Sequence, residues 1–190
     1  IGTRAAAAGT TISGVAVSEL EGASYWLVIN LGDSRTYRMA GGALEQISVD
    51  HSAVQELIDA GALAAEDAEQ HPERHVITKA IGAGSRAEPD YWLLPANAGD
   101  RLLVCSDGLS RELDAEQIAR VLREEISPQA AATRLVHEAL LHGGHDNVTV
   151  IVIDAHSMLD DDHPTARIGG GQQDGQDEDT VPRAESGGAG

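Results

Sequence analysis

Three short, largely apolar stretches, each next to an aspartate, most constrain how this chain can fold. The stretches are residues 25–31, 101–106 and 148–153, and the aspartates beside them are Asp33, Asp107 and Asp146. Runs of this length that contain β-branched residues are typical of strands buried inside a sheet. Because a protein core cannot solvate a carboxylate, each aspartate needs a cation, a hydrogen-bond donor or water at the end of its strand. The sequence therefore predicts a sheet core that presents carboxylates at its ends.

Each of these aspartates also lies within two residues of a glycine, at Gly32, Gly108 and Gly144. A single aspartate beside a glycine usually marks only a turn. Three such pairs at the ends of buried strands favour a shared site instead. Carboxylate oxygens without soft ligands are the natural partners of hard divalent cations, so the pattern favours Mg²⁺ or Mn²⁺.

Other kinds of reactive site are poorly supported by the sequence. The pairs His71 with His75 and His142 with His145 have spacings near those of zinc ligands, but no paired cysteines accompany them. Cys105 is the only cysteine and lies inside an apolar run, which predicts a core residue rather than a nucleophile. The sequence contains neither a phosphate-binding P-loop nor a Gly-x-Ser-x-Gly motif.

The charge of the chain limits its partners. The formal net charge is −18 at pH 7, so we expect neither nucleic acid nor an anionic membrane surface as the main partner. No stretch approaches the ~18 apolar residues of a membrane span, and no signal peptide is recognised. A lone cysteine excludes an intrachain disulfide. We therefore expect a cytoplasmic protein.

The apolar periodicity divides the chain into a folded part, residues 1–155, and a tail, residues 156–190. In the folded part we expect a β-hairpin over residues 11–31 with its turn at 21–24, and a second hairpin over 36–47. We also expect strands over 90–94, 101–106 and 148–153, and helices over 52–61, 114–125 and 128–143. This order predicts an α+β fold. The tail has few large apolar residues and many acidic ones, which predicts disorder, with Thr180 as a candidate phosphorylation site.

Six short motifs, taken in order, resemble those of the metal-dependent PPM-type Ser/Thr protein phosphatases (protein phosphatase 2C-like). The resemblance is strongest to the bacterial branch that reverses Hanks-type kinases, and it covers residues 9–154. The motifs are residues 9–11 (Gly-Thr-Thr), 30–35 (Asn-Leu-Gly-Asp-Ser-Arg), 50–52 (Asp-His-Ser), 77–82 (Ile-Thr-Lys-Ala-Ile-Gly), 100–109 (Asp-Arg-Leu-Leu-Val-Cys-Ser-Asp-Gly-Leu) and 144–149 (Gly-His-Asp-Asn-Val-Thr).

The resemblance implies a β-sandwich flanked by helices, in an α-β-β-α arrangement, with a centre of two Mn²⁺ or Mg²⁺ ions. It implies that Asp107 and Asp146 are ligands of one ion, and that Asp33 and Asp107 bind a third, weaker ion found in bacterial members. A water molecule held by the metals is then the nucleophile, and no side chain acts as one. The implied partners are phosphorylated proteins and a Hanks-type kinase.

Two histidines near the motifs are expected to have lesser roles. Residues 62–75 match the flap that overhangs the active site in the family, and we expect His75 to be an exposed loop residue there. His51 precedes a helix, and we expect it to be structural.

The sequence departs from the family pattern at its beginning. The N-terminal motifs, including the Asp-Gly-Met-Gly-Gly segment whose aspartate bridges the two metals, do not occur in it. We therefore expect the fold to be N-terminally incomplete and these 190 residues to be inactive alone, as the C-terminal part of a longer enzyme. Two alternatives stay open: a non-catalytic pseudophosphatase remnant that binds phosphoproteins or kinases, and a phosphatase dedicated to one stress-signalling regulator.

Overall fold

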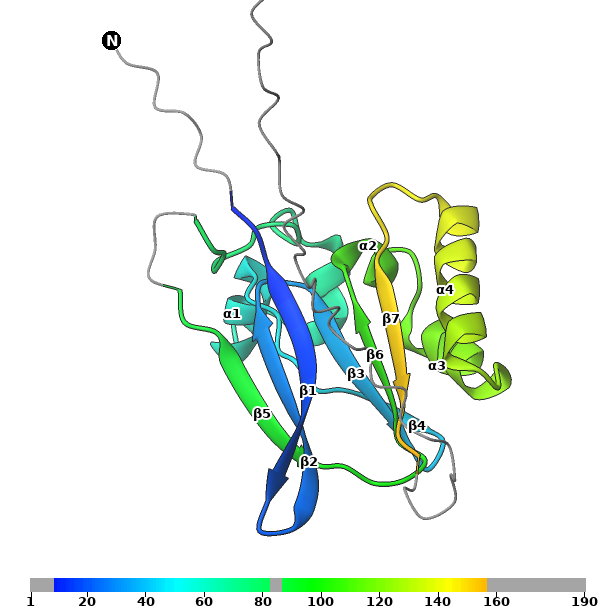
Figure 1. Cartoon of the computed structure of the whole chain (residues 1–190). Coiled ribbons are helices and arrows are strands. Elements are labelled where there is room, and N and C mark those ends of the chain that lie inside the picture. Colours follow the sequence, from blue (N-terminus) through cyan, green and yellow to red (C-terminus); the bar gives the residue numbers. More distant parts are fainter. Residues whose placement is uncertain (1–8, 83–86, 157–190) are drawn as a thin grey trace, which may run out of the picture. The chain divides into compact units, whose positions relative to one another are not determined.

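The structure, a computed structural model, describes residues 9–82 and 87–156. Its strands form two antiparallel sheets, one of three strands in the order β1-β2-β5 and one of four in the order β4-β3-β6-β7 (Figure 1). Side-chain contacts such as Ser13 Oγ to Thr36 Oγ1, at 3.0 Å, join the two sheets face to face. The predicted α+β sandwich is therefore confirmed. The tail beyond residue 156, including Thr180, lies outside the described residues.

The three-stranded sheet is built on a tight hairpin. Strand β1 (Ile12–Leu20) pairs with β2 (Ala23–Leu31), and β5 (Asp90–Pro95) pairs with the other edge of β2. Only Glu21 and Gly22 form the turn, both with positive φ (53° and 79°), which is the geometry of a two-residue hairpin. The sequence predicts this turn at residues 21–24. Both strands are longer than predicted because Glu21 adopts a left-handed conformation that is unusual for a residue other than glycine.

The four-stranded sheet contains the predicted second hairpin. Strands β3 (Arg35–Ala40) and β4 (Ala43–Gln46) are joined through Gly41 and Gly42, both with positive φ. Strand β6 (Arg101–Cys105) lies between β3 and β7 (Val150–Asp154). Leu102 and Leu103 of β6 point to opposite faces and are both fully buried. A strand buried on both faces reads as a continuous apolar run, which is how β6 appears in the sequence.

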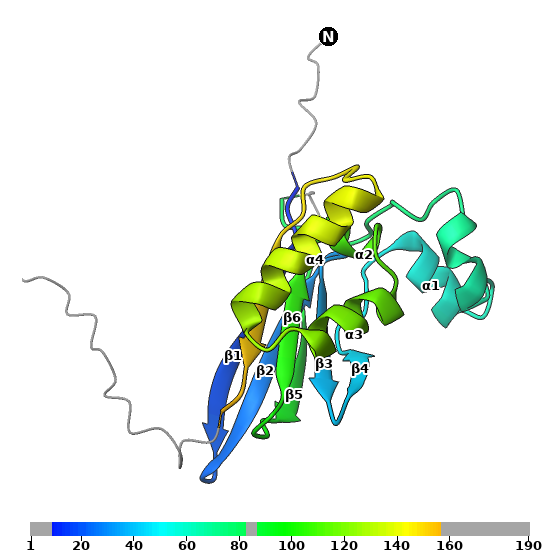
Figure 2. The ribbon, with the colours of Figure 1, turned by 90° about the vertical axis from the view of Figure 1, so that its right-hand side faces the viewer.

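Two helices cover the outer face of the four-stranded sheet (Figure 2). They are α3 (Ala115–Glu124) and α4 (Pro128–His142). Both predicted starts are confirmed: Asp114 and Gln117 form a capping box, and Ser127 caps α4 before Pro128. The core between helices and sheet consists mainly of the following buried residues: Tyr37, Met39, Leu103, Leu109, Leu113, Ile118, Val121, Leu122 and Leu135.

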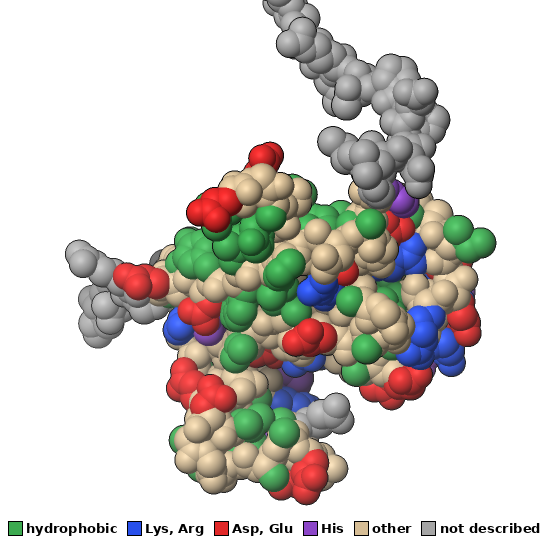
Figure 3. Space-filling view, turned by 90° about the horizontal axis from the view of Figure 1, so that it is seen from below, with side chains coloured by type: hydrophobic (Ala, Val, Ile, Leu, Met, Phe, Trp, Pro, Cys, Tyr) green, Lys and Arg blue, Asp and Glu red, His purple; other side chains and the backbone are tan. Residues whose placement is uncertain are grey.

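The outer face of the three-stranded sheet is apolar and exposed in the described part of the chain. Tyr91 and Leu93 of β5 alternate with inward-facing residues and are 61% and 49% exposed. Seen from below, hydrophobic side chains gather at the surface on the left, the side on which Figure 1 draws this sheet (Figure 3). The described residues thus supply two sheets and one helical layer of the predicted α-β-β-α arrangement.

The described residues between β4 and β5 contain the predicted short helix and the stretch 62–75 that matches the flap. They include α1 (Ala53–Asp59), which Ser52 caps by accepting from the N–H of Gln55, and a 3₁₀ helix, η1 (Ala65–Gln70). The chain returns beside its start, where the Thr78 N–H donates to the His51 carbonyl at 2.9 Å. Across residues 9–82 and 87–156, no helix combines the length and the apolar character needed to cross a membrane.

Candidate metal centre

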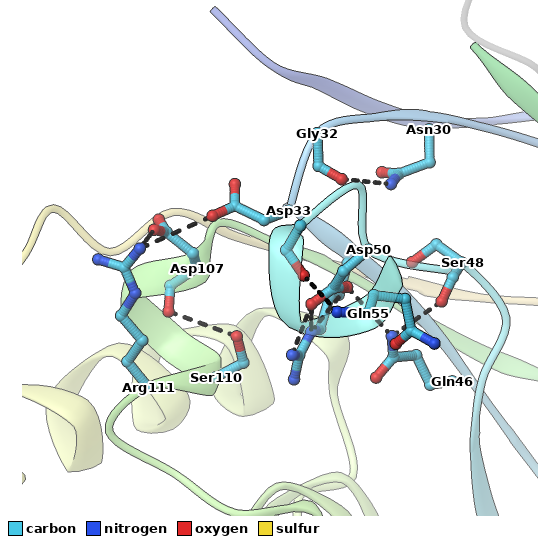
Figure 4. Close-up of polar contacts among 12 residues, drawn as sticks. Asn30, Gly32, Asp33, Gln46, Ser48, Asp50, Gln55, Asp107, Ser110 and Arg111 are labelled. Atoms are coloured by element: carbon cyan, nitrogen blue, oxygen red, sulfur yellow. Dashed lines mark hydrogen bonds and ion pairs between the residues drawn. The ribbon is translucent and has the colours of Figure 1, made fainter. Parts of the chain in front are cut away.

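The three predicted aspartates come together around one side chain, Arg111. The Arg111 guanidinium lies 3.0 Å from Asp146 Oδ2 and 3.7 Å from Asp33 Oδ2, and it also pairs with Asp107 Oδ2. Figure 4 shows Asp33 and Asp107 reaching toward this guanidinium from different segments of the chain. The structure therefore places the three carboxylates around a shared cationic centre.

Asp107 is positioned by a short helix rather than by the glycine turn that the sequence suggests. It opens α2 (Asp107–Ser110), which follows β6 directly. A Cβ at Gly108 would clash with the carbonyl oxygen of Asn147, so only glycine allows the loop before β7 to pack this closely. Ser106 Oγ fastens the same contact, since it donates to Asn147 O and accepts from the Thr149 N–H, both at 3.0 Å.

Asp33 is positioned by the turn between β2 and β3, which His51 holds. The Gly32 N–H donates to His51 Nδ1 at 3.0 Å, and the His51 N–H donates to the Gly32 carbonyl at 2.9 Å. With Nδ1 acting as acceptor, the ring proton lies on Nε2, which is 3.0 Å from Asp90 Oδ2. His51 is also buried. Its predicted structural role is therefore confirmed.

Asp146 lies in the loop that follows α4. Glu112, two residues beyond the end of α2, stabilises this loop through His145. Glu112 Oε1 accepts from the His145 N–H at 3.1 Å and lies 2.9 Å from His145 Nδ1. Gly143 has a φ of 149°, and a Cβ there would clash with the His145 ring. Asp146 Oδ1 accepts from the Asn147 N–H at 2.7 Å. The backbone before and after Asp146 is thus fixed.

The electrostatics of the cluster favour a bound cation. Burial, and then the nearby charge of Asp107, raise the pKa of Asp33 above its ordinary value, although a backbone hydrogen bond and Arg111 oppose this. Three carboxylates facing one guanidinium leave an excess of negative charge. The donor set, made of carboxylate oxygens that converge on one cation, therefore fits Mg²⁺ or Mn²⁺ chemically.

In the structure, the three aspartates lie around the Arg111 guanidinium. Within residues 9–82 and 87–156, no three acidic, histidine or cysteine side chains are close enough together to hold a metal ion directly. Binding of a metal by these aspartates would require their carboxylates to approach one another. The metal-ligand roles of Asp33, Asp107 and Asp146 therefore stay a prediction.

Arg111 and Glu112 were not among the site residues predicted from the sequence. One signal for Arg111 is available in the sequence: Asp107 and Arg111 are four residues apart, the spacing at which oppositely charged side chains meet on a helix. No local signal identifies Glu112, because its partner His145 is 33 positions away. His75 is exposed, as predicted, and some desolvation together with the charges of Arg111 and Arg74 lowers its pKa.

Comparison with known proteins identifies relatives of one kind. A Ser/Thr phosphatase stp of Listeria welshimeri is 33% identical over 150 residues, which are 79% of this chain and 58% of that protein. A Ser/Thr protein phosphatase PstP of Mycobacterium tuberculosis is 40% identical over 164 residues, 84% of this chain and 30% of that protein. The chain thus spans little more than half of the length of the Listeria protein. No protein-family model matches it.

Solved structures agree with the sequence matches. The crystal structure of the Mycobacterium tuberculosis phosphatase PstP/Ppp superposes with a TM-score of 0.71 at 38% identity, covering 78% of this chain and 61% of that one. A structure of the PstP catalytic domain in complex with two manganese ions superposes with a TM-score of 0.68 at 36% identity, covering 78% and 60%.

Proposed function

We propose that this chain, which is related to the PPM-type Ser/Thr protein phosphatases of bacteria, supplies part of the metal centre of such a phosphatase. The observation that carries the proposal is the convergence of Asp33, Asp107 and Asp146 on one cationic position. The manganese ions in a structural relative support the same assignment.

In this proposal the residues of the chain bind and orient, and none of them is a covalent nucleophile. Asp107 and Asp146 would hold one Mn²⁺ or Mg²⁺ ion, and Asp33 with Asp107 would hold a further, weaker one. Such ions, when bound, lower the pKa of a coordinated water and neutralise the charge of a phosphate group. Cys105 does not compete as a nucleophile, because burial raises the pKa of its thiol to about 12.

The substrates we propose are phosphoserine and phosphothreonine side chains of proteins, which a Hanks-type kinase would produce. The names of the relatives, all Ser/Thr or protein phosphatases, support this substrate class. We also propose a cytoplasmic location. The buried free thiol of Cys105 is consistent with a reducing compartment.

The test is Mn²⁺-dependent release of phosphate from a phosphothreonine peptide. We would assay the 190-residue chain alone, and joined to the part of the Listeria welshimeri relative that the match leaves uncovered. Asp107→Asn should lower the Mn²⁺-dependent rate by more than the ~10–100-fold typical of residues that only support metal ligands. Asp59→Asn, an exposed aspartate on α1, is the matched control and should leave the rate unchanged.

Two results would count against the proposal. Phosphate release that does not depend on Mn²⁺, or that survives Asp107→Asn, would remove the metal assignment. Binding of the phosphopeptide without any turnover would instead support the non-catalytic alternative.

A further inference from the structure

Arg111 is unusual in being paired with every one of the proposed metal ligands. In the part of the chain that the structure describes, it is the only basic side chain within 4.0 Å of Asp33, Asp107 or Asp146 carboxylate oxygens. Its guanidinium uses the Oδ2 atom of each. These are oxygens that a divalent cation bound by the three aspartates would also need.

We propose that Arg111 is an internal counter-cation of the aspartate cluster, which a divalent metal must displace in order to bind. The inference rests on the proposed function, since it takes the three aspartates as metal ligands. A guanidinium and a divalent ion cannot share the same carboxylate oxygens without strong repulsion between the two cations. Metal binding and the Arg111 contacts therefore exclude each other.

The structure leaves Arg111 free to move away. Its backbone N–H is anchored to the carbonyls of Asp107 and Leu109, but its side chain is 33% exposed and, among the described residues, donates to no backbone carbonyl. Displacement thus requires only rotation of a long side chain into solvent. Neither α2 nor the loop between α4 and β7 needs to unfold.

The arrangement also explains how a cluster of acidic groups persists without metal. Three carboxylates that lie close together repel one another, and Asp33 is partly buried. Arg111 neutralises part of this charge. It should therefore stabilise the metal-free chain and weaken its affinity for metal.

The experiment compares Mn²⁺ binding by the 190-residue chain and three variants, using calorimetry and the electron paramagnetic resonance of free Mn²⁺. Arg111→Gln should bind Mn²⁺ at least about 10-fold more tightly, within the ~5–150-fold range of typical coupling between ligands. Arg111→Lys should fall between this variant and the unaltered chain. Arg123→Gln changes the net charge equally but removes only exposed contacts, the pair with Glu116 and a hydrogen bond to the Gly42 carbonyl, so it should bind as the unaltered chain does.

A second readout separates displacement from a general charge effect. In EDTA, Arg111→Gln should melt at a lower temperature than the unaltered chain, and saturating Mn²⁺ should remove or reverse the difference. With Mg²⁺, the Nε–H resonance of Arg111, assigned by its loss in Arg111→Gln, should shift toward the position of an unpaired arginine. Circular dichroism confirms that each variant is folded.

The outcomes are distinguishable. Equal Mn²⁺ affinity of the unaltered chain and Arg111→Gln, or weaker binding by the variant, overturns the inference and leaves the metal site in place. Failure of both folded proteins to bind Mn²⁺ overturns the inference together with the proposed metal ligands.

Discussion

The two ends of strand β6 carry the same pair of residue types in two different settings. At its start, Arg101 pairs with Asp154, and both are largely buried. Beyond its end, Arg111 pairs with Asp107, Asp33 and Asp146. The two arginines differ in the other hydrogen-bond acceptors of their guanidinium groups. Arg101 also donates to the carbonyls of Leu122, Glu125 and Ile126, at 2.6–2.9 Å, whereas the Arg111 side chain has only carboxylate partners among the described residues.

This comparison separates a structural ion pair from an exchangeable one. The carbonyls that Arg101 satisfies belong to the end of α3 and the residues after it, so the side chain fixes the helix to the sheet. No metal ion could replace it there. Around the Arg111 side chain, by contrast, each acceptor in the described part of the chain is a carboxylate oxygen, which a divalent cation can also bind.

The largest effect on stability should come from removing the ion pair between Arg101 and Asp154 at the start of β6. Arg101→Met should lower the free energy of unfolding by about 3–5 kcal/mol, because it leaves the Asp154 carboxylate buried without a partner. Arg111→Gln in EDTA should cost at most about 1 kcal/mol, as expected for a more exposed pair. Urea denaturation of both variants measures the difference, and equal losses would contradict the distinction.

A smaller effect, dependent on pH, is expected from Asp100, which precedes Arg101. Burial alone would raise the pKa of this carboxyl, but hydrogen bonds from the Asn97 N–H, Arg38 and Trp26 outweigh it and hold the pKa below its ordinary value. A lowered pKa stabilises the fold above the unfolded-state pKa of about 3.9, and this stabilisation is lost as the pH falls through the folded-state pKa.

Asp100→Asn should therefore lower the free energy of unfolding by about 2 kcal/mol at neutral pH, and by progressively less below about pH 4. The measurement is urea denaturation at a series of pH values. Asp59→Asn, at an exposed position, serves as the control and should differ little from the unaltered chain at any pH. A deficit that stays constant down to pH 2 would show that the charge of Asp100 is not the cause.

Much of the fold can be predicted from local sequence patterns. The turn at Gly41 and Gly42, the capping box of Asp114 and the Ser127-Pro128 start of α4 depend on residues within four positions of one another. The chemistry of each pattern fixes its geometry. Where an unusual conformation intervened, as at Glu21, the boundaries of the elements were wrong by a few residues.

The candidate site was only half predictable, for a physical reason. Its carboxylates follow buried strands, and the sequence shows this directly for Asp33 and Asp107. What surrounds them depends on how α2 packs against the loop after α4, and Arg111 and Asp146 are 35 positions apart. No periodicity or local motif in the sequence indicates such a contact. Arg111 and Glu112 therefore emerge only from the structure.

The smallest effect should come from Glu112, which lies beyond the end of β6. Glu112 stabilises the loop that contains Asp146 through its contacts with His145. Glu112→Ala removes the acceptor of the His145 N–H, so the loop should become more mobile while the core stays unchanged. Mn²⁺ affinity should fall by about 10-fold, as for other residues that orient metal ligands. The melting temperature in EDTA should hardly change.

The control is Glu116→Ala, which removes an equal charge from an exposed position on α3. Hydrogen exchange of the His145 amide should quicken in Glu112→Ala and not in the control. Faster exchange with unchanged Mn²⁺ affinity would show that the site tolerates movement of the loop and that Glu112 does not position Asp146 for the metal. Weaker Mn²⁺ affinity with unchanged exchange would mean that the charge of Glu112 acts on the metal directly. Only the combination of faster exchange and weaker affinity assigns Glu112 to the positioning of Asp146.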